Sequence, residues 1–323
     1  MRRSMAEDFK KIFDSITAEV GKQVVGQKEN IQYVLMGIVC GGNILMEGAP
    51  GLGKTLLIKT FSRALNLPFS RIQFTPDLMP MDIIGTEIIR NTQEKMEISF
   101  EKGPIFSSLI LADEINRATP KTQSALLQAM AEKTVTVGKT TYLLEEPFFV
   151  LATQNPIEME GTYHLPEAQL DRFMFKVEMK LPKQKELLDI VDITVGEKTE
   201  VEIKEIASKE EIVEMKKLVY SVPVCDEVKN KAITILLNTH PQETQVTEVK
   251  DYVRWGCSPR GLQALILGAK AKALTEGRYH VALQDLYDIA PIALDHRLKL
   301  NFRGISDRVD GKDVILRILE QVM

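Results

Sequence analysis

Apolar residues recur at helical spacing near the start of the chain and in short runs after it. Residues 9–16 and 31–38 carry apolar positions three and four residues apart, which predicts two amphipathic helices. Residues 120–133 have a similar helical pattern. Buried strands are predicted from short apolar runs at 43–47, 69–74, 107–113, 148–153 and 174–179. Strands that alternate with helices predict an α/β fold, a parallel sheet covered by helices on both faces.

The pattern changes around Leu181 and Pro182, after which strands give way to helices. We therefore predict an α/β domain at residues 1–182 and a smaller helical domain at residues 183–323. The helices expected in the second domain lie at 183–192, 208–220, 225–239, 258–275 and 282–296.

Composition narrows the classes of protein that fit. The chain has 323 residues, of which 44% are hydrophobic and 27% charged, as in ordinary globular proteins. Its net charge of −4 argues against a duplex DNA-binding domain, which is usually strongly basic. No apolar run reaches the roughly 18 residues of a membrane helix, so no membrane segment is predicted.

The three cysteines point to a reducing compartment. Cys40, Cys225 and Cys257 are far apart, odd in number and lack CxxC spacing. This pattern supports neither a disulfide framework nor a zinc site, and a cytoplasmic location is the natural expectation.

The stretch GAPGLGKT has the pattern G-x-x-x-x-G-K-[ST] of a phosphate-binding loop. It lies between a predicted strand and a predicted helix, the context that this motif requires. Its glycines let successive backbone N–H groups and the helix N-terminus point at bound phosphates. Lys54 is expected to reach the β- and γ-phosphates, and the Thr55 hydroxyl to ligate Mg²⁺. The candidate nucleotide-binding residues are Gly48, Ala49, Pro50, Gly51, Leu52, Gly53, Lys54 and Thr55.

A second motif, SLILADEINRAT, is a predicted strand that runs directly into Asp113 and Glu114. Such carboxylates can simply form a solvated turn. With a phosphate-binding loop in the same chain, a functional role is favoured, because a carboxylate on a neighbouring strand is needed to hold Mg²⁺. Asp113 is assigned that role, and Glu114 is expected to orient or deprotonate an attacking water.

Two further polar residues are candidates for the same site. Asn155 follows the strand at 148–153, where its amide could hydrogen-bond the water and the γ-phosphate, although it could also cap a turn before Pro156. Arg260 lies on the first turn of a helix that Ser258 is expected to cap. A cation there opposes the helix dipole and needs an anion, either the γ-phosphate or a surface carboxylate.

The motifs GAPGLGKT, LADEINRA, LATQNP, LPEAQLDRF and SPRG, in this order across residues 25–265, resemble the MoxR family of AAA+ ATPases. The resemblance implies an ATP-binding α/β domain, a helical lid and a ring, usually a hexamer, with ATP sites between subunits. The roles it implies are Walker B aspartate for Asp113, catalytic glutamate for Glu114, sensor 1 for Asn155, sensor 2 for Arg260, and a segment beside the adenine pocket for Val25 and Gly26.

The resemblance also implies an arginine finger, a cation sent into the neighbouring subunit's site. Arg172 in LDRF matches that position, and such a cation offsets charge that develops in the transition state. A salt bridge to Asp171 or Glu167 is the alternative for Arg172. Arg117 in EINRA is the competing finger or an interface residue.

Two stretches read as inserted hairpins. Residues 85–106 predict a hairpin with its tip near Asn91 to Lys95, and residues 135–145 predict a second around Gly138 and Lys139. In a ring, both are expected to face the pore or the substrate side; each could instead be a plain surface hairpin.

The function expected from these motifs and from the family resemblance is ATP hydrolysis, with Mg²⁺, coupled to the remodelling or maturation of a protein partner, such as a metal-dependent complex. A nucleic-acid motor is the first alternative, although no basic stripe is interleaved with aromatic residues. A nucleotide switch is the second, but Asn230 and Lys231 are not followed by the rest of an N-K-x-D motif.

Overall fold

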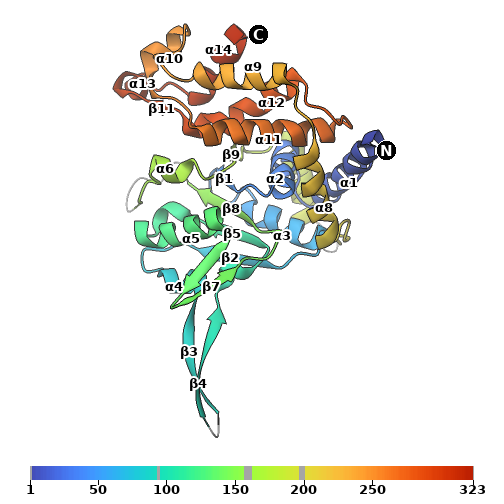
Figure 1. Ribbon diagram of the computed structural model, residues 1–323. Helices are drawn as coiled ribbons and strands as arrows, with labels where there is room; N and C mark the ends of the chain where they lie inside the picture. The colour runs from blue at the N-terminus through green and yellow to red at the C-terminus, as the bar shows by residue number, and fades with distance from the viewer. Residues whose placement is uncertain (1, 93–94, 156–161, 196–200, 323) are drawn as a thin grey trace.

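The computed structural model describes residues 2–92, 95–155, 162–195 and 201–322. Five parallel strands form the central sheet in the order β2-β5-β8-β1-β9 (Figure 1). Their bounds are Ile44–Glu47 for β1, Phe69–Gln73 for β2, Leu109–Asp113 for β5, Phe149–Gln154 for β8 and Phe175–Glu178 for β9. The predicted parallel sheet is therefore confirmed.

Alternating residues of each strand pack into separate cores on the two faces of the sheet. Leu109 and Leu111 of β5 pack into the core that contains side chains of helices α1 (Arg2–Gly21), α2 (Lys28–Cys40) and α3 (Lys54–Ala64). Ile110 and Ala112, one residue out of phase, pack with helix α5 (Pro120–Glu132) on the other face. Because strand side chains alternate in direction, an uninterrupted apolar run produces a strand that is buried on both faces.

Both predicted hairpins are confirmed. Strands β3 (Gly85–Thr92) and β4 (Lys95–Lys102) form a long antiparallel ribbon that extends far from the sheet (Figure 1). The predicted tip falls partly on residues 93–94, which lie outside the described residues. Strands β6 (Thr134–Val137) and β7 (Thr140–Leu143) form the shorter hairpin. The short helices α4 (Pro80–Ile84) and η1 (Pro104–Phe106) flank the long ribbon in the chain.

An aromatic cluster joins the two hairpins near their bases. The rings of Phe100 and Tyr142 stack with centroids 4.5 Å apart, and Phe106 contacts both rings edge to face. Such contacts stabilise by about 1 kcal/mol each beyond the area they bury. The aromatic cluster therefore ties the bases of the two hairpins to each other.

The second part of the chain is almost entirely helical. The predicted helices are present as α7 (Gln184–Thr194), α8 (Lys209–Ser221), α9 (Asp226–Leu237), α11 (Pro259–Thr275) and α12 (Leu283–Leu294). The sequence pattern did not delimit α10 (Thr247–Tyr252), α13 (Phe302–Ser306), α14 (Gly311–Val322) or the antiparallel strand pair β10 (Val253–Trp255) and β11 (Lys299–Leu300).

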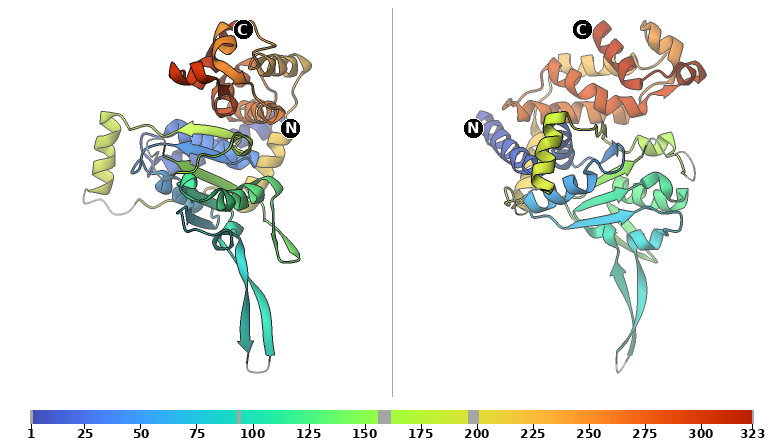
Figure 2. Two further views of the ribbon diagram at one scale, coloured as in Figure 1. Left: turned by 90° about the vertical axis from the view of Figure 1, so that its left-hand side faces the viewer. Right: turned by 180° about the vertical axis from the view of Figure 1, so that it is seen from behind.

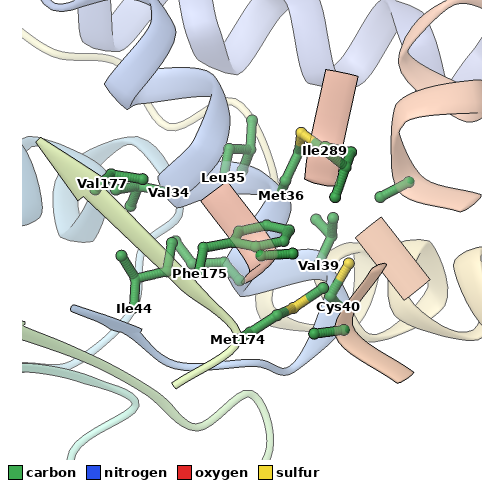
Figure 3. Close-up of a cluster of buried hydrophobic side chains, with 14 of the residues drawn as sticks. Val34, Leu35, Met36, Val39, Cys40, Ile44, Met174, Phe175, Val177 and Ile289 are labelled. Carbon is green, nitrogen blue, oxygen red and sulfur yellow. The ribbon is translucent and has the colours of Figure 1, made fainter. Parts of the chain in front are cut away.

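Helices of the second part pack directly onto the first part. Helix α11 contacts α1 and α2, and α8 contacts α2 as well as α11. The domain boundary predicted near residue 182 stays a prediction, because one apolar core runs through both parts. Figure 3 shows this junction between α2, β1, β9 and α12, with labelled side chains Val34, Leu35, Met36, Val39, Cys40, Ile44, Met174, Phe175, Val177 and Ile289.

Candidate active site

The loop GAPGLGKT connects strand β1 to helix α3 at the carboxyl edge of the sheet. Gly51 and Gly53 have φ angles of +82° and +93°, the left-handed region that favours glycine. A Cβ atom at either position would meet nothing within 4 Å, so open space lies beside the loop. At Gly48 a Cβ atom would lie 2.9 Å from the carbonyl oxygen of Met179, which excludes any side chain there. The loop has the shape and the room that a phosphate-binding loop needs.

Lys54 connects this loop electrostatically to the end of strand β5. Its ammonium donates a hydrogen bond to the carbonyl oxygen of Gly48. Burial lowers the pKa of Lys54, while the negative charges of Asp113 and Glu114 oppose that shift. The structure therefore brings together the lysine and both carboxylates that the sequence predicted for one site.

Asp113 is held by side chains from both neighbouring strands. The Thr153 hydroxyl of β8 donates to its Oδ1 at 2.6 Å, and the Arg71 guanidinium of β2 lies 2.7 Å from its Oδ2. The Asp113 side chain is only 15% exposed. A solvated turn does not fit this burial and these partners. A partly buried carboxylate fixed at the edge of a phosphate-binding loop is suited to holding a hydrated divalent cation.

Glu114 leaves the strand through a sharp backbone turn. Its φ of +58° lies in the left-handed region, and its N–H donates to the Thr153 hydroxyl at 3.0 Å. Gln73 of β2 donates to its Oε2 at 2.9 Å, and the Nε of Arg117 lies 3.2 Å from the same oxygen. These contacts hold the carboxylate in one orientation. Such an orientation is needed for a group that must meet an attacking water.

Asn155 directly follows β8, which lies between β5 and β1 in the sheet. The predicted adjacency to the strand of Asp113 is therefore confirmed. The Asn155 side chain is buried. Its role as sensor 1 stays a prediction.

Val25 and Gly26 lie beside the segment that follows β9. Gly26 has a φ of +77°, and a Cβ atom there would lie 2.9 Å from the Cβ of Pro182. Both residues line a cavity of about 580 Å³ between the end of α1, the start of α2 and Glu186. This space is suitable for part of a ligand, and the proposed position beside adenine stays a prediction.

Arg260 and Arg172 lie together in a cleft away from the phosphate-binding loop. Both line a cleft of about 660 Å³ between the end of α5 and helix α11, and no residue of the GAPGLGKT loop lines that cleft. Arg260 lies 4.0 Å from Asp171, so the nearest anion in the described structure is a carboxylate. The structure does not bring Arg260 to the phosphate loop of its own chain, and its role as sensor 2 stays a prediction.

The alternative salt bridge for Arg172 is absent among the described residues. Asp171 instead accepts hydrogen bonds from Arg297 and Ser258, and Glu167 pairs with Lys299. Arg172 donates to the carbonyl oxygen of Leu127 at 2.7 Å, and its buried Nε has no hydrogen-bond partner. Arg117, the competing finger, contacts Glu114 of its own chain. The role of either arginine as a finger stays a prediction.

Removing the Asp171 carboxylate is expected to destabilise the junction between the two parts of the chain. Arg297 is 3% exposed and lies 2.8 Å from Asp171, while burial lowers its pKa and Asp171 opposes that shift. Asp171→Ala would leave a buried guanidinium without its anion, at a cost of about 3 kcal/mol. Urea unfolding should show this loss, whereas the control Asp8→Ala, at an exposed position of α1, should unfold like the wild type. Equal stability of both variants would contradict the importance of this ion pair.

The sequence did not identify several residues that contact the Asp113 and Glu114 carboxylates. Arg71, Gln73 and Thr153 contact the two carboxylates from the flanking strands. Arg71 and Gln73 are two residues apart on β2, so the sequence pattern indicates that they lie on the same side of that strand. This pattern identifies them as partners of the carboxylates only when β2 and β8 are known to be the neighbours of β5.

The chain is similar to ATPases of the AAA family and to individual relatives over most of its length. The family described as "ATPase family associated with various cellular activities (AAA)" matches residues 43–175, and the AAA lid domain matches residues 245–318. Chaperone MoxR1 of Mycobacterium tuberculosis is 40% identical, over 94% of this chain and 80% of its own length. Protein YeaC of Bacillus subtilis is 37% identical, over 98% and 96%.

A solved structure is also similar. The crystal structure of a candidate ATPase from Cytophaga hutchinsonii superposes with a TM-score of 0.91 and 40% identity, and covers 98% of this chain and 95% of that one. Among the described residues of our chain, no helix is long and apolar enough to cross a membrane.

Proposed function

The chain belongs to the MoxR family of AAA+ ATPases, and we propose that it hydrolyses ATP between the subunits of a ring to remodel or mature a protein partner. The observation that carries the ATP chemistry is the open glycine loop with Lys54 bonded to its Gly48 carbonyl, at the same edge of the parallel sheet as Asp113 and Glu114. A cytoplasmic location is part of the proposal and accords with three free thiols, of which Cys225 is exposed.

Residues of one chain would bind the nucleotide. The backbone N–H groups of residues 48–55 and the Lys54 ammonium would hold the phosphates. Mg²⁺, when bound, would offset phosphate charge and would be held by Thr55 and Asp113. The Asp113 carboxylate, 15% exposed at the end of β5, fits this role, because Mg²⁺ keeps waters and takes few protein ligands.

Glu114 would act as the general base. Its carboxylate would accept a proton from the attacking water, while Gln73 and Arg117 keep it oriented. Thr153 contacts both the Asp113 carboxylate and the Glu114 N–H. It would therefore fix the position of Asp113, which holds the cation, relative to Glu114, which accepts the proton. Asn155 would orient the water or the γ-phosphate from the adjacent strand.

A neighbouring subunit would complete the site. Arg172 lies in a cleft without loop residues and makes no ion pair with Asp171 or Glu167, which favours a role for it in a second chain. Its positive charge would offset charge that develops on the phosphates in the transition state. Arg260 lies in the same cleft, so we propose that both arginines act on the ATP site of the same neighbouring subunit. Six subunits is the ring size expected from the family.

The projecting hairpins would contact the protein client. The long ribbon β3–β4 exposes Ile89, and β7 exposes Leu143. Exposed apolar side chains on a projection are suited to contacts with another protein. The aromatic cluster at the hairpin bases would make both move with the ATP-binding domain.

Replacing Lys54 with alanine tests the proposed nucleotide site. The variant should bind ATP at least 10-fold more weakly, because it loses a charge-assisted contact to phosphate worth about 1.5–3 kcal/mol. Titration with a fluorescent ATP analogue gives the affinity, and phosphate release gives the turnover. The matched control is Lys59→Ala, an exposed lysine on the same helix. Equal binding by both variants would contradict the site.

A further inference from the structure

Helix α7 presents an apolar face that no other described part of the chain buries. None of its residues is buried. Leu188 and Val191 are 62% and 53% exposed, and Leu187 and Val195 are also exposed. Figure 2 shows α7 standing away from the sheet, on the side opposite to α5. An amphipathic helix in this position normally packs against another surface.

The exposed apolar side chains of α7 lie on one face. Leu187, Val191 and Val195 follow one another at four-residue spacing, and Leu188 lies beside them. Ile190 and Ile193 point toward the other side of the helix and are only partly exposed. Asp189 and Asp192 border the exposed stripe on the side of Leu188. We call this surface, Leu187, Leu188, Val191 and Val195 with the two aspartates, the α7 stripe.

The cleft that contains Arg172 and Arg260 has an apolar lining that is complementary to the α7 stripe. Leu262, Ile266 and Leu267 of α11 line it as partly buried apolar residues, with Met130 and Met174 beside them. Its volume of about 660 Å³ is sufficient for several aliphatic side chains.

The charges of the cleft are mostly positive. The cations are Lys133, Arg172, Arg260, Lys270 and Arg297, and Asp171 is the carboxylate among the described lining residues. Asp171 already accepts hydrogen bonds from Arg297 and Ser258. An incoming acidic helix would therefore meet unneutralised positive charge.

We propose that the α7 stripe of one copy docks into this cleft of a second copy. The apolar stripe would fill the space along Leu262 and Ile266, and Asp189 and Asp192 would meet cations that line the cleft, such as Lys270. This is the helix-in-groove mode of recognition, with charge complementarity that selects the orientation. The inference rests on the proposed function in that both require a ring.

The occupant is a second copy because the two surfaces lie on opposite sides of one chain. Helix α7 begins beside Gly26, since a Cβ atom at Gly26 would lie 3.0 Å from the Oε2 of Glu186. The cleft lies between α5 and α11. Complementary surfaces on opposite sides of a molecule produce head-to-tail association, which closes into a ring when the rotation allows. The same contact would bring Arg172 of one copy toward the Gly26 region of the next.

The first test measures assembly in the full chain. Leu188→Asp/Val191→Asp should lower the association constant at least 100-fold in sedimentation velocity with a non-hydrolysable ATP analogue, because two apolar side chains lose their burial and two charges are added. Both side chains are exposed in the single chain, so folding should be unchanged by circular dichroism. The matched control is Ile233→Asp, an exposed apolar residue on α9, which should assemble like the wild type.

The second test uses charge exchange between the two surfaces. Asp189→Lys/Asp192→Lys should weaken assembly at least 10-fold, and Lys270→Glu should also weaken it, since each change places like charges together. Combining the three substitutions should restore part of the association. Rescue of this kind requires that the two surfaces meet.

The outcomes separate this inference from the proposed function. Normal assembly of the α7 stripe variants, with a wild-type ring, would overturn the docking alone. A wild type that stays monomeric at every protein and nucleotide concentration would overturn both. Loss of assembly in the stripe variants, with rescue by charge exchange, supports the docking even if the Lys54 experiment fails.

Discussion

Arg172→Ala is expected to bind ATP normally and to hydrolyse it about 1000-fold more slowly, the scale seen when an arginine finger is lost. Binding should survive because the loop, Lys54 and Asp113 belong to the same chain. The cleft that contains Arg172 is not lined by the loop, so the missing charge would be felt only by a neighbour. ATP affinity and phosphate release, measured on the same preparation, check this result.

A mixing experiment decides whether Arg172 acts between chains. Arg172→Ala and Lys54→Ala are each expected to be inactive. In mixed rings, Arg172 of the Lys54→Ala subunit can complete the intact loop of the Arg172→Ala subunit, so part of the activity should return. No recovery in rings shown to be mixed would favour Arg117 as the finger. Arg317→Ala, an exposed arginine on α14, should keep full activity as a control.

Glu114→Gln is expected to lower ATP turnover by about 100-fold or more, the contribution of a general base. Glutamine keeps the size of the side chain and an acceptor oxygen for Gln73 and Arg117, but it cannot take the proton from water. Binding of ATP should remain close to that of the wild type. A pull-down with this variant should therefore hold ATP and the client protein together.

The matched control for Glu114→Gln is Glu132→Gln. Glu132 is an exposed residue at the end of α5 that contacts only Gln128 among the hydrogen bonds of the described residues. It should hydrolyse ATP at the wild-type rate. Normal turnover in Glu114→Gln would show that another group accepts the proton.

The local features of this protein could be predicted from sequence because they depend on neighbouring residues. Apolar runs of strand length between amphipathic helices predicted the parallel sheet, and β5 ends at Asp113 as expected. The glycines of GAPGLGKT predicted a loop between strand and helix, where positive φ angles at Gly51 and Gly53 require glycine. Turn residues also predicted both hairpins.

The partners of the catalytic carboxylates depended on strand order. Thr153 contacts Asp113 from 40 positions away, and Arg71 does so from 42. Periodicity shows which side of a strand a residue occupies, but it does not show which strands become neighbours. Only the order β2-β5-β8-β1-β9 brought these side chains to the edge of the sheet that carries the phosphate loop.

The positions of the arginines and of α7 were likewise decided by tertiary packing. From sequence, Arg260 was expected to meet either the γ-phosphate or a surface carboxylate. In the structure, helix α11 packs on α1 and α2, and Arg260 lies in the cleft of Arg172, 4.0 Å from Asp171. The pattern at residues 183–192 predicted a helix, but not that its apolar side chains stay exposed among the described residues. Sequence alone determined the elements and the chemistry of the loop. The packing of distant segments, whose contacts no local pattern encodes, decided which charged side chains meet.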